Sequence, residues 1–346
     1  MRYEDVYVAA TGSALPPGMP VEEALAAGLV DRRIAVSTGI RSIAVAGPGD
    51  SPPELAARAA AEALARSGHT PAEVQLLLHA TVWYQGHDLW PPASYVQRTA
   101  IGNQCPAVEV RQMSNGGMAA LELAAAFLGS PAGRRDTAAV LTAADRFAGP
   151  HFDRWRSDPG TVYGDGGSAL VLSRRGGFAR LRSLVTVSDP ELEGMHRGDD
   201  PFGTGLGALR SPVDLDPLKR QFLATAGKSF VLARTLAGQE TALKQALAEA
   251  DTGLDGIATL VLPHFGRRRL QAVFLERLDV DIARTTWEFG SGVGHLGAAD
   301  QFAGLDHLAA TGRLRPGERC LVMGVGAGFT WSCAVLEIEQ RPTWQD

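Results

Sequence analysis

Residues 108–121, Val-Glu-Val-Arg-Gln-Met-Ser-Asn-Gly-Gly-Met-Ala-Ala-Leu, join a short β-branched run to an Ala/Leu-rich helix through one sharp turn. Ser114 lies at the junction, beside the first free N–H groups of the helix. This position suits a nucleophile, because such N–H groups stabilise an oxyanion. It also suits a helix N-cap, which serine favours. The local sequence leaves both interpretations open.

Strands and helices alternate along the rest of the chain. Continuous apolar runs indicate buried strands, and apolar residues every three to four positions indicate helices. The clearest strands are 75–81, 137–144 and 258–264, and the clearest helices are 52–67, 116–128 and 267–278. We also expect a turn and strand over 37–45, a long helix near 218–250 with candidate breaks at Gly227 and Gly238, and a glycine-led helix over 293–311. The alternation predicts an α/β fold.

Two stretches of the chain resemble each other. Residues 164–173 read GDGGSALVLS and residues 324–338 read GVGAGFTWSCAVLEI, so each places a glycine turn before an outgoing apolar strand. We therefore predict two related halves packed together. We assign residues 1–175 to the half that carries Ser114 and residues 176–346 to the half that carries two candidate histidines.

Bulk properties exclude several classes of protein. A net charge of −5 argues against a general nucleic-acid binder. The apolar runs are too short and interrupted for a membrane span, and the acidic N-terminus does not fit a signal peptide. Cys105, Cys320 and Cys333 lack metal-like spacing, and their odd number argues against a disulfide framework. We expect a cytoplasmic protein without a metal, a nucleic-acid partner or a membrane partner.

Two histidines are candidates for acid–base chemistry. His264 ends the strand 258–264, where ligands meet an open α/β sheet, although backbone bonds at a strand end would also satisfy it. His295 follows three closely spaced glycines, and Asp300 comes five residues later. Asp300 either orients His295 or is a solvated helix residue. The two side chains meet only if His295 lies at the entry of the helix.

Residues 324–328, Gly-Val-Gly-Ala-Gly, form a glycine-rich run near the chain end. The pattern resembles a dinucleotide-binding loop, but too little sequence follows it for a nucleotide-binding unit. A tight turn that presents N–H groups to an active site is the better interpretation.

Together these stretches resemble the thiolase superfamily, and most closely β-ketoacyl-ACP synthase III. The motifs that match are 38–41 (Thr-Gly-Ile-Arg), 164–166 (Gly-Asp-Gly) and 326–331 (Gly-Ala-Gly-Phe-Thr-Trp). The resemblance implies the thiolase fold, with two duplicated halves in a layered αβαβα arrangement, the active site between them, and a homodimer. The family's nucleophilic cysteine, its Pro-His-Gln-Ala-Asn histidine and its Gly-Asn asparagine correspond here to Ser114, His264 and His295.

These departures from the family pattern decide the expected function. A serine needs a base, which His295 can supply with Asp300 to orient it. This pattern resembles the synthase-III-like acyltransferases of secondary metabolism, which move an acyl chain, in some cases aromatic, from a carrier protein to another acceptor. The resemblance implies polyketide or antibiotic biosynthesis. The oxyanion would bind to the N–H groups of Ser114 and Gly328, with His264 as a further donor and His295 again acting as base for the acceptor.

The expected donor is the phosphopantetheine arm of an acyl carrier protein, with no bound cofactor. Arg267, Arg268 and Arg269 fall where related synthases have basic residues at the tunnel mouth, and guanidinium groups suit an acidic carrier and its phosphate. Alternatively, they form a solvated helix start. In the family, a Trp and an Arg flank the adenine of CoA. Those two residues are absent at the corresponding positions here, near Arg33 and Ser37. Their absence favours a carrier protein over free CoA as the donor. The acceptor is a small molecule or a second carrier protein.

Three alternatives remain open at this point. The chain is a decarboxylative condensing enzyme with serine in place of cysteine, or a non-catalytic partner that holds carrier proteins. In a third alternative, Ser114 is never acylated and His295 activates the acceptor directly.

Overall fold

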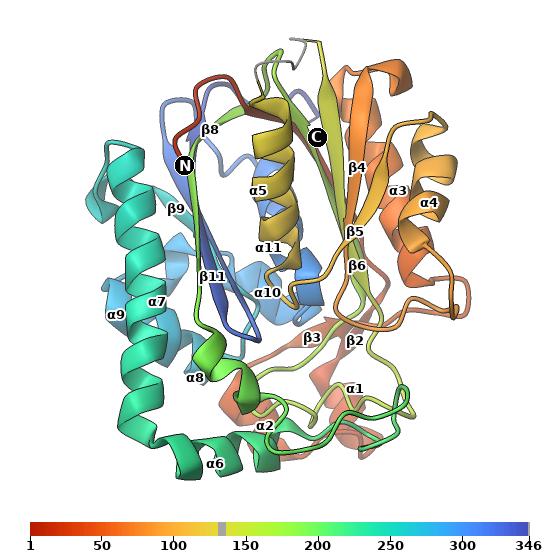
Figure 1. Cartoon of the computed structure of the whole chain (residues 1–346), viewed down its shortest axis with the longest axis vertical. Coiled ribbons are helices and arrows are strands. Elements are labelled where there is room, and N and C mark those ends of the chain that lie inside the picture. Colours follow the sequence, from red (N-terminus) through yellow and green to blue (C-terminus); the bar gives the residue numbers. More distant parts are fainter. Residues whose placement is uncertain (131–135, 345–346) are drawn as a thin grey trace.

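The computed structural model describes residues 1–130 and 136–344, which share one mixed sheet in the strand order β5-β4-β6-β7-β1-β8-β11-β10-β9 (Figure 1). The strands are β1 (Tyr7–Ala14), β4 (Val74–Ala80), β5 (Ala107–Val110), β6 (Ala138–Asp145), β7 (Gly166–Ser173), β8 (Ala179–Ser188), β9 (Thr259–Val261), β10 (Arg319–Gly326) and β11 (Thr330–Ile338). A small separate sheet pairs β2 (Gly18–Pro20) with β3 (Ser42–Ala44).

The large sheet repeats one pattern of strand pairing. In the first half, β4 runs parallel to β6, β6 antiparallel to β7, and β7 antiparallel to β1. In the second half, β9 runs parallel to β10, β10 antiparallel to β11, and β11 antiparallel to β8. The halves join where Tyr7 and Val8 of β1 pair with Arg180 and Ala179 of β8. The prediction of a duplicated α/β fold is confirmed; the boundary between residues 175 and 176 stays a prediction.

Helices form three layers around the two halves of the sheet (Figure 1). α3 (Pro52–Ser67) and α4 (Pro92–Val96) cover the outer side of the first half, and α7 (Lys228–Glu249) covers the outer side of the second. α5 (Gly116–Leu128) and α11 (Asp300–Ala310) lie between the halves. The predicted αβαβα layering is therefore confirmed.

Small residues let the central layer close, and this closure assembles the site. A Cβ on Gly116 would lie 3.2 Å from the Cβ atoms of Ala80 and Ala298, and a Cβ on Gly117 would lie 2.6 Å from the carbonyl oxygen of Ala298. The start of α5 therefore packs directly on the turn that follows His295. Larger residues at these positions would separate the two segments.

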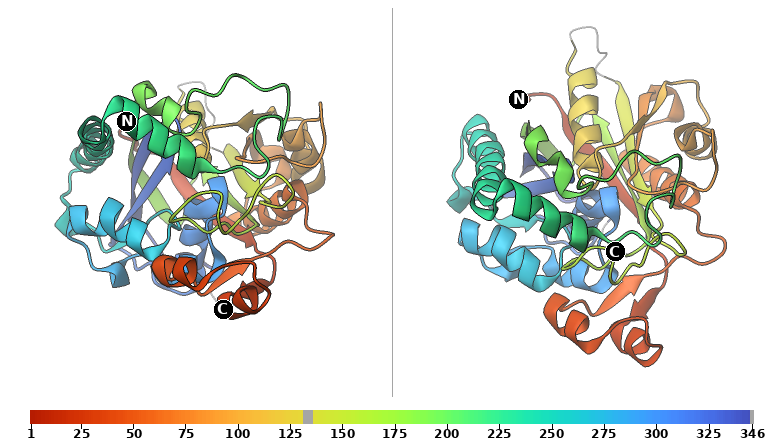
Figure 2. Two further views of the ribbon diagram at one scale, coloured as in Figure 1. Left: turned by 90° about the horizontal axis from the view of Figure 1, so that it is seen from below. Right: turned by 60° about the horizontal axis from the view of Figure 1, so that its bottom comes forward.

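Six other α-helices are present in the described residues. They are α1 (Val21–Ala26), α2 (Arg32–Thr38), α6 (Leu215–Ala226), α8 (Arg267–Leu270), α9 (Glu276–Leu278) and α10 (Trp287–Val293). Figure 2 shows the N-terminal helices at the edge of the molecule, where α2 contacts α8. Over the described residues, no helix has both the length and the apolar character needed to cross a membrane.

Several predicted boundaries were wrong. The helix expected over 218–250 is interrupted at Gly227 as predicted, but Gly238 continues α7 because its missing side chain makes room for the ring of Trp331. The helix expected over 293–311 begins only at Asp300, and residues 294–299 form a turn with one 3₁₀ segment. The turn and strand expected over 37–45 begin later than predicted, because α2 extends to Thr38. Asp31 accepts a hydrogen bond from Ile34 N at the start of this helix.

Candidate active site

Ser114 lies in a strained turn and does not cap the helix. Met113, just before it, has φ of +50°, which side chains other than glycine rarely adopt. Asn115 occupies the N-cap position of α5, and the Ser114 hydroxyl instead lies 2.8 Å from Nε2 of His295. The capping interpretation of Ser114 is therefore wrong.

His295 and Asp300 meet because His295 precedes the helix. The backbone N of His295 donates to Val162 O, so the residue sits in an extended turn, and Asp300 is the first residue of α11. His295 Nδ1 lies 2.5 Å from Asp300 Oδ2, and Asp300 Oδ1 accepts a 2.7 Å bond from Leu296 N. Asp300 is fully buried, which excludes the solvated alternative. Ser114, His295 and Asp300 thus form one continuous hydrogen-bonded chain.

The same carboxylate also holds His264. The backbone N of His264 donates to Asp300 Oδ2 over 2.8 Å, and its Nδ1 lies 3.1 Å from Asp300 Oδ1 and from Gly294 O. Burial alone would raise the pKa of Asp300, but the adjacent His264 and His295 outweigh burial and hold that pKa below its ordinary value. Asp300 is therefore an ionised partner for both imidazoles at neutral pH.

Aromatic rings enclose His295, and the sequence alone did not identify them. Tyr163 packs edge-on against the imidazole, with ring centroids 5.0 Å apart, and Phe265 lies at 5.9 Å. The guanidinium of Arg269 lies 4.5 Å above the Phe265 ring. Tyr163 stands beside the Gly164-Asp165-Gly166 motif and Phe265 follows His264, so position next to a motif was the available signal. These rings limit the orientations open to the base.

The glycine run packs against the turn that carries Ser114. A Cβ on Gly326 would overlap the carbonyl oxygen of Gln112 and lie 3.0 Å from Asn115 N, so this strand end reaches both sides of Ser114. Gly328 has φ of +123°, and a Cβ there would meet no atom within 4 Å. Open space beside Gly328 suits the predicted oxyanion hole, whose role stays a prediction.

We expect Gly326→Ala to damage the site more than the fold. The added methyl has to push the backbone of Gln112 or Asn115 aside, at a cost of about 1–3 kcal/mol in the free energy of unfolding. The rate of chemical modification of the Ser114 hydroxyl should fall by more than the change in the unfolding midpoint accounts for, because the Ser114 hydroxyl itself moves. Gly49→Ala, at a position with open space and no positive φ, serves as the control. Wild-type modification rates in Gly326→Ala would contradict this expectation.

The three arginine side chains do not lie together: Arg269 turns into the protein, and its expected contact with a carrier protein stays a prediction. Its Nη1 lies 2.9 Å from Asp158 Oδ2 and 2.6 Å from Thr161 Oγ1, in an ion-pair cluster that Lys219 joins. Sequence spacing missed this cluster because its members come from distant segments. Arg267 and Arg268 instead line a surface hollow of about 530 Å³ between α2 and α8.

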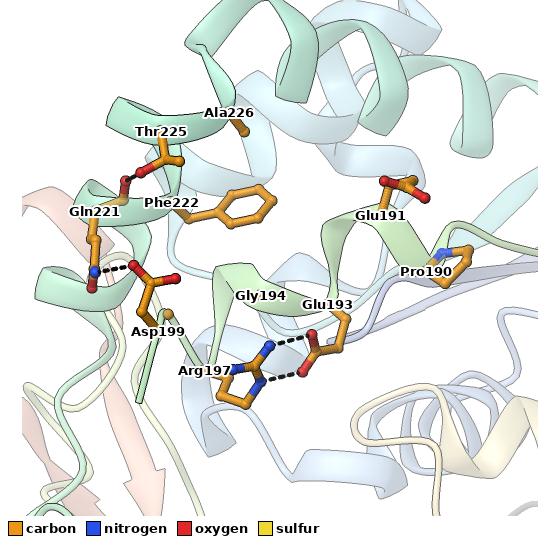
Figure 3. A pocket seen from close by; sticks show the side chains of 11 residues that line it. Pro190, Glu191, Glu193, Gly194, Arg197, Asp199, Gln221, Phe222, Thr225 and Ala226 are labelled. Carbon is orange, nitrogen blue, oxygen red and sulfur yellow. Dashed lines mark hydrogen bonds and ion pairs between the residues drawn. The ribbon is translucent and has the colours of Figure 1, made fainter. Parts of the chain in front are cut away.

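The segment 188–216 contacts Phe329, the residue that follows the glycine run. Asp189 N donates to Phe329 O over 2.8 Å, and the ring of His196 lies 5.4 Å from that of Phe329. Burial lowers the pKa of His196 to about 4, so this ring is neutral at pH 7. A hollow of about 310 Å³ lies between this segment and α6. Figure 3 shows Arg197 paired with Glu193 in its lining. Its lining contains no member of the Ser114 chain.

Comparison with known proteins assigns the family. Residues 247–338 match the model of the 3-oxoacyl-[acyl-carrier-protein] synthase III C-terminal domain. The solved structure of ChlB3, an acyltransferase, superimposes with a TM-score of 0.93 at 38% identity, covering 99% of this chain and 100% of that one. The chain belongs to the synthase-III-like branch of the thiolase superfamily. Membership in this enzyme family supports a catalytic role.

Two further synthase-III-like proteins match at lower identity. β-Ketoacyl-[acyl-carrier-protein] synthase III of Roseiflexus castenholzii is 28% identical over 311 residues, which is 88% of this chain and 89% of that protein. The priming β-ketosynthase of the R1128 polyketide pathway superimposes with a TM-score of 0.78 at 21% identity, over 99% and 98% of the two chains, and this likeness shows the shared fold.

Proposed function

We propose that this synthase-III-like protein transfers an acyl group from the phosphopantetheine thioester of an acyl carrier protein, through Ser114, to an acceptor hydroxyl or thiol. The observation that carries the proposal is the 2.8 Å contact from Ser114 Oγ to His295 Nε2, continued by the 2.5 Å contact to Asp300. Such a chain is what a serine needs in order to act as a nucleophile at neutral pH. The similarity to the ChlB3 acyltransferase supports the same reaction class.

In the first half-reaction, His295 Nε2 takes the hydroxyl proton as Ser114 Oγ attacks the thioester carbon. The oxyanion is received by the N–H groups of Ser114 and Gly328, each worth about 3 kcal/mol of barrier. The C–S bond then breaks and the thiolate leaves, so Ser114 carries the acyl ester and His295 carries the proton. In the second half-reaction the acceptor takes the acyl group and the serine hydroxyl re-forms.

Decarboxylative condensation is the second candidate, because curated relatives are named β-ketoacyl-[acyl-carrier-protein] synthase III. The cysteines argue against a cysteine-dependent form of this reaction, and the serine-dependent form is left to the experiment below. Burial raises the pKa of Cys320 to about 12 and raises that of Cys333 well above its ordinary value, so neither forms a thiolate readily. Cys105 precedes β5, and burial raises the pKa of its thiol as well.

Incubation with a panel of acyl carrier proteins, including malonyl and aromatic acyl forms, tests the proposal. Mass spectrometry follows the acyl group on the protein and on added alcohols, thiols and free carriers, while CO₂ release is measured in parallel. Acyl transfer without CO₂ supports the proposal. Carbon–carbon bond formation with CO₂ release would establish the condensing enzyme instead. The panel also tests the expected polyketide or antibiotic context and the aromatic acyl group.

We expect the double variant Arg267→Glu, Arg268→Glu to weaken use of carrier-bound donors. Both arginines line the hollow next to α2, and in the described residues neither guanidinium has a recorded ion pair. Reversing both charges should raise KM for an acyl carrier protein about 10- to 100-fold, because an acidic partner is then repelled. KM for a small acyl thioester should change little. Arg315→Glu, at an exposed site, is the control; equal losses with both donors would contradict the assignment.

The homodimer and the cytoplasmic location remain part of this proposal. Analytical ultracentrifugation of the purified protein tests the first, and fractionation of the producing cells tests the second.

A further inference from the structure

Two imidazoles share one carboxylate in this site, and only one of them has a recorded partner on its far side. His295 uses Nδ1 to reach Asp300 and Nε2 to reach Ser114. His264 also turns Nδ1 to Asp300, but its Nε2 is buried and has no hydrogen-bond partner among the described residues. An unpartnered polar atom in a buried site is costly, so its presence on the carboxylate that also holds His295 calls for an explanation.

The surroundings of His264 Nδ1 fix which nitrogen carries the proton. Nδ1 lies 3.1 Å from the carbonyl oxygen of Gly294 and 3.1 Å from a carboxylate oxygen of Asp300, and both groups are pure acceptors. Nδ1 must therefore donate. A neutral His264 then presents a lone pair at Nε2, which accepts a proton. The family resemblance implied that His264 donates to the oxyanion. Its Nε2 could do so only if the ring were cationic.

Asp300 contacts both imidazoles, so one carboxylate serves two possible bases. After acylation the proton from Ser114 resides on His295, and Asp300 balances its charge. His264 Nε2 still has no hydrogen-bond partner among the described residues. His264, with its Nε2 unpartnered, and His295, which carries the serine proton, then both contact the carboxylate of Asp300.

Resting on the function proposed above, we propose that His264 is the catalytic base for the acceptor. As the acceptor oxygen attacks the acyl carbon of Ser114, His264 Nε2 takes the acceptor's proton. The bond from the acyl carbon to Ser114 Oγ breaks, and Oγ takes its proton back from His295. The imidazolium charge passes from His295 to His264, which then loses its proton to water or to the departed thiolate. Each imidazole thus acts once in the cycle.

Two substitutions of His264 separate a base from an oxyanion donor. His264→Asn keeps an N–H at the Nδ1 position toward Gly294 and Asp300 and removes Nε2. His264→Gln places an amide at the Nε2 position, which donates a hydrogen bond but cannot take a proton. His69→Gln, a buried histidine on Ser173 far from the site, is the control for loss of a buried ring.

The experiment measures the two half-reactions separately with acyl-N-acetylcysteamine thioesters. Thiol release and intact mass report acylation of Ser114, and product formation with added alcohol reports transfer. We expect both His264 variants to acylate within about threefold of wild type, to accumulate acyl-enzyme, and to transfer to an alcohol about 10²- to 10⁴-fold more slowly. The deficit should shrink with a thiol acceptor, which ionises without help. Each variant's unfolding midpoint is recorded alongside.

The outcomes are distinguishable. If His264→Gln transfers at the wild-type rate, or if acylation falls as much as transfer, His264 is an oxyanion donor or a structural residue and this inference is wrong. If no thioester or carrier acylates Ser114 of the wild-type protein, the proposed function itself fails, before His264 is tested.

Discussion

Ser114→Ala is expected to lower acyl transfer by about 10⁴-fold or more and to remove any covalent acyl adduct. The hydroxyl is the only group in the proposed chain that can hold the acyl unit. The fold should persist, because Ser114 precedes the N-cap position of α5 and its side chain contacts the site rather than the helix. Steady-state transfer from the best carrier donor, with circular dichroism on the same sample, measures both effects.

The control for this substitution is Ser94→Ala, an exposed serine on α4. It removes a hydroxyl without touching the site and should leave transfer unchanged. If Ser114→Ala retains transfer, either His295 activates the acceptor directly or the protein acts as a non-catalytic partner. His295→Ala separates these two, since it stops only the first.

Asp300→Asn is expected to have the second largest effect, about 10⁴-fold on transfer. An amide in place of the carboxylate no longer fixes the proton on Nδ1 of His295, so Nε2 loses the lone pair that faces Ser114. His264 is affected in the same way, because its Nδ1 and backbone N both bind Asp300. One residue therefore misaligns both imidazoles, and both half-reactions should slow.

The same substitution should reduce the free energy of unfolding by about 3–5 kcal/mol, since it disrupts a buried charge network. Asp300 has a pKa below its ordinary value in the folded state, so its stabilising contribution is full above about pH 4–5 and is lost as the pH falls further. Denaturant unfolding of wild type should thus show acid destabilisation that Asp300→Asn lacks. Asp306→Asn is the matched control on α11: it disturbs bonds to Thr11 and Arg66, and should cost stability but little transfer. Equal transfer losses in both variants would contradict the role of Asp300.

The fold was predictable because each layer has a local sequence signal. Buried strands such as 137–144 and helices such as 52–67 follow from apolar patterning, and the duplicated glycine turns indicate two halves. Boundaries failed where long-range packing decides them. Gly238 has the sequence of a helix break, yet it stays helical because the Trp331 ring fills the space of its missing side chain.

The nucleophile, the base and its carboxylate were also predictable, because a turn, a glycine run and a short spacing mark them. The contact of Asp300 with both His264 and His295 was not predictable. His264 reaches that carboxylate through its own backbone N, 36 residues away, and no local pattern reports such a contact. The inward position of Arg269 was not predictable for a related reason: Asp158, which binds its guanidinium and the ammonium of Lys219, comes from a distant segment. Pairings across the fold decide which charged groups remain at the surface.

The central claim is that Ser114 carries the acyl group. The most direct measurement is acid-quenched peptide mapping of wild-type protein after brief incubation with the acyl carrier panel. The account predicts an acyl mass on the peptide that contains Ser114, formed without CO₂ release and discharged when acceptor is added. Product formation with no adduct on Ser114 at any time, under conditions where an ester survives, would contradict it.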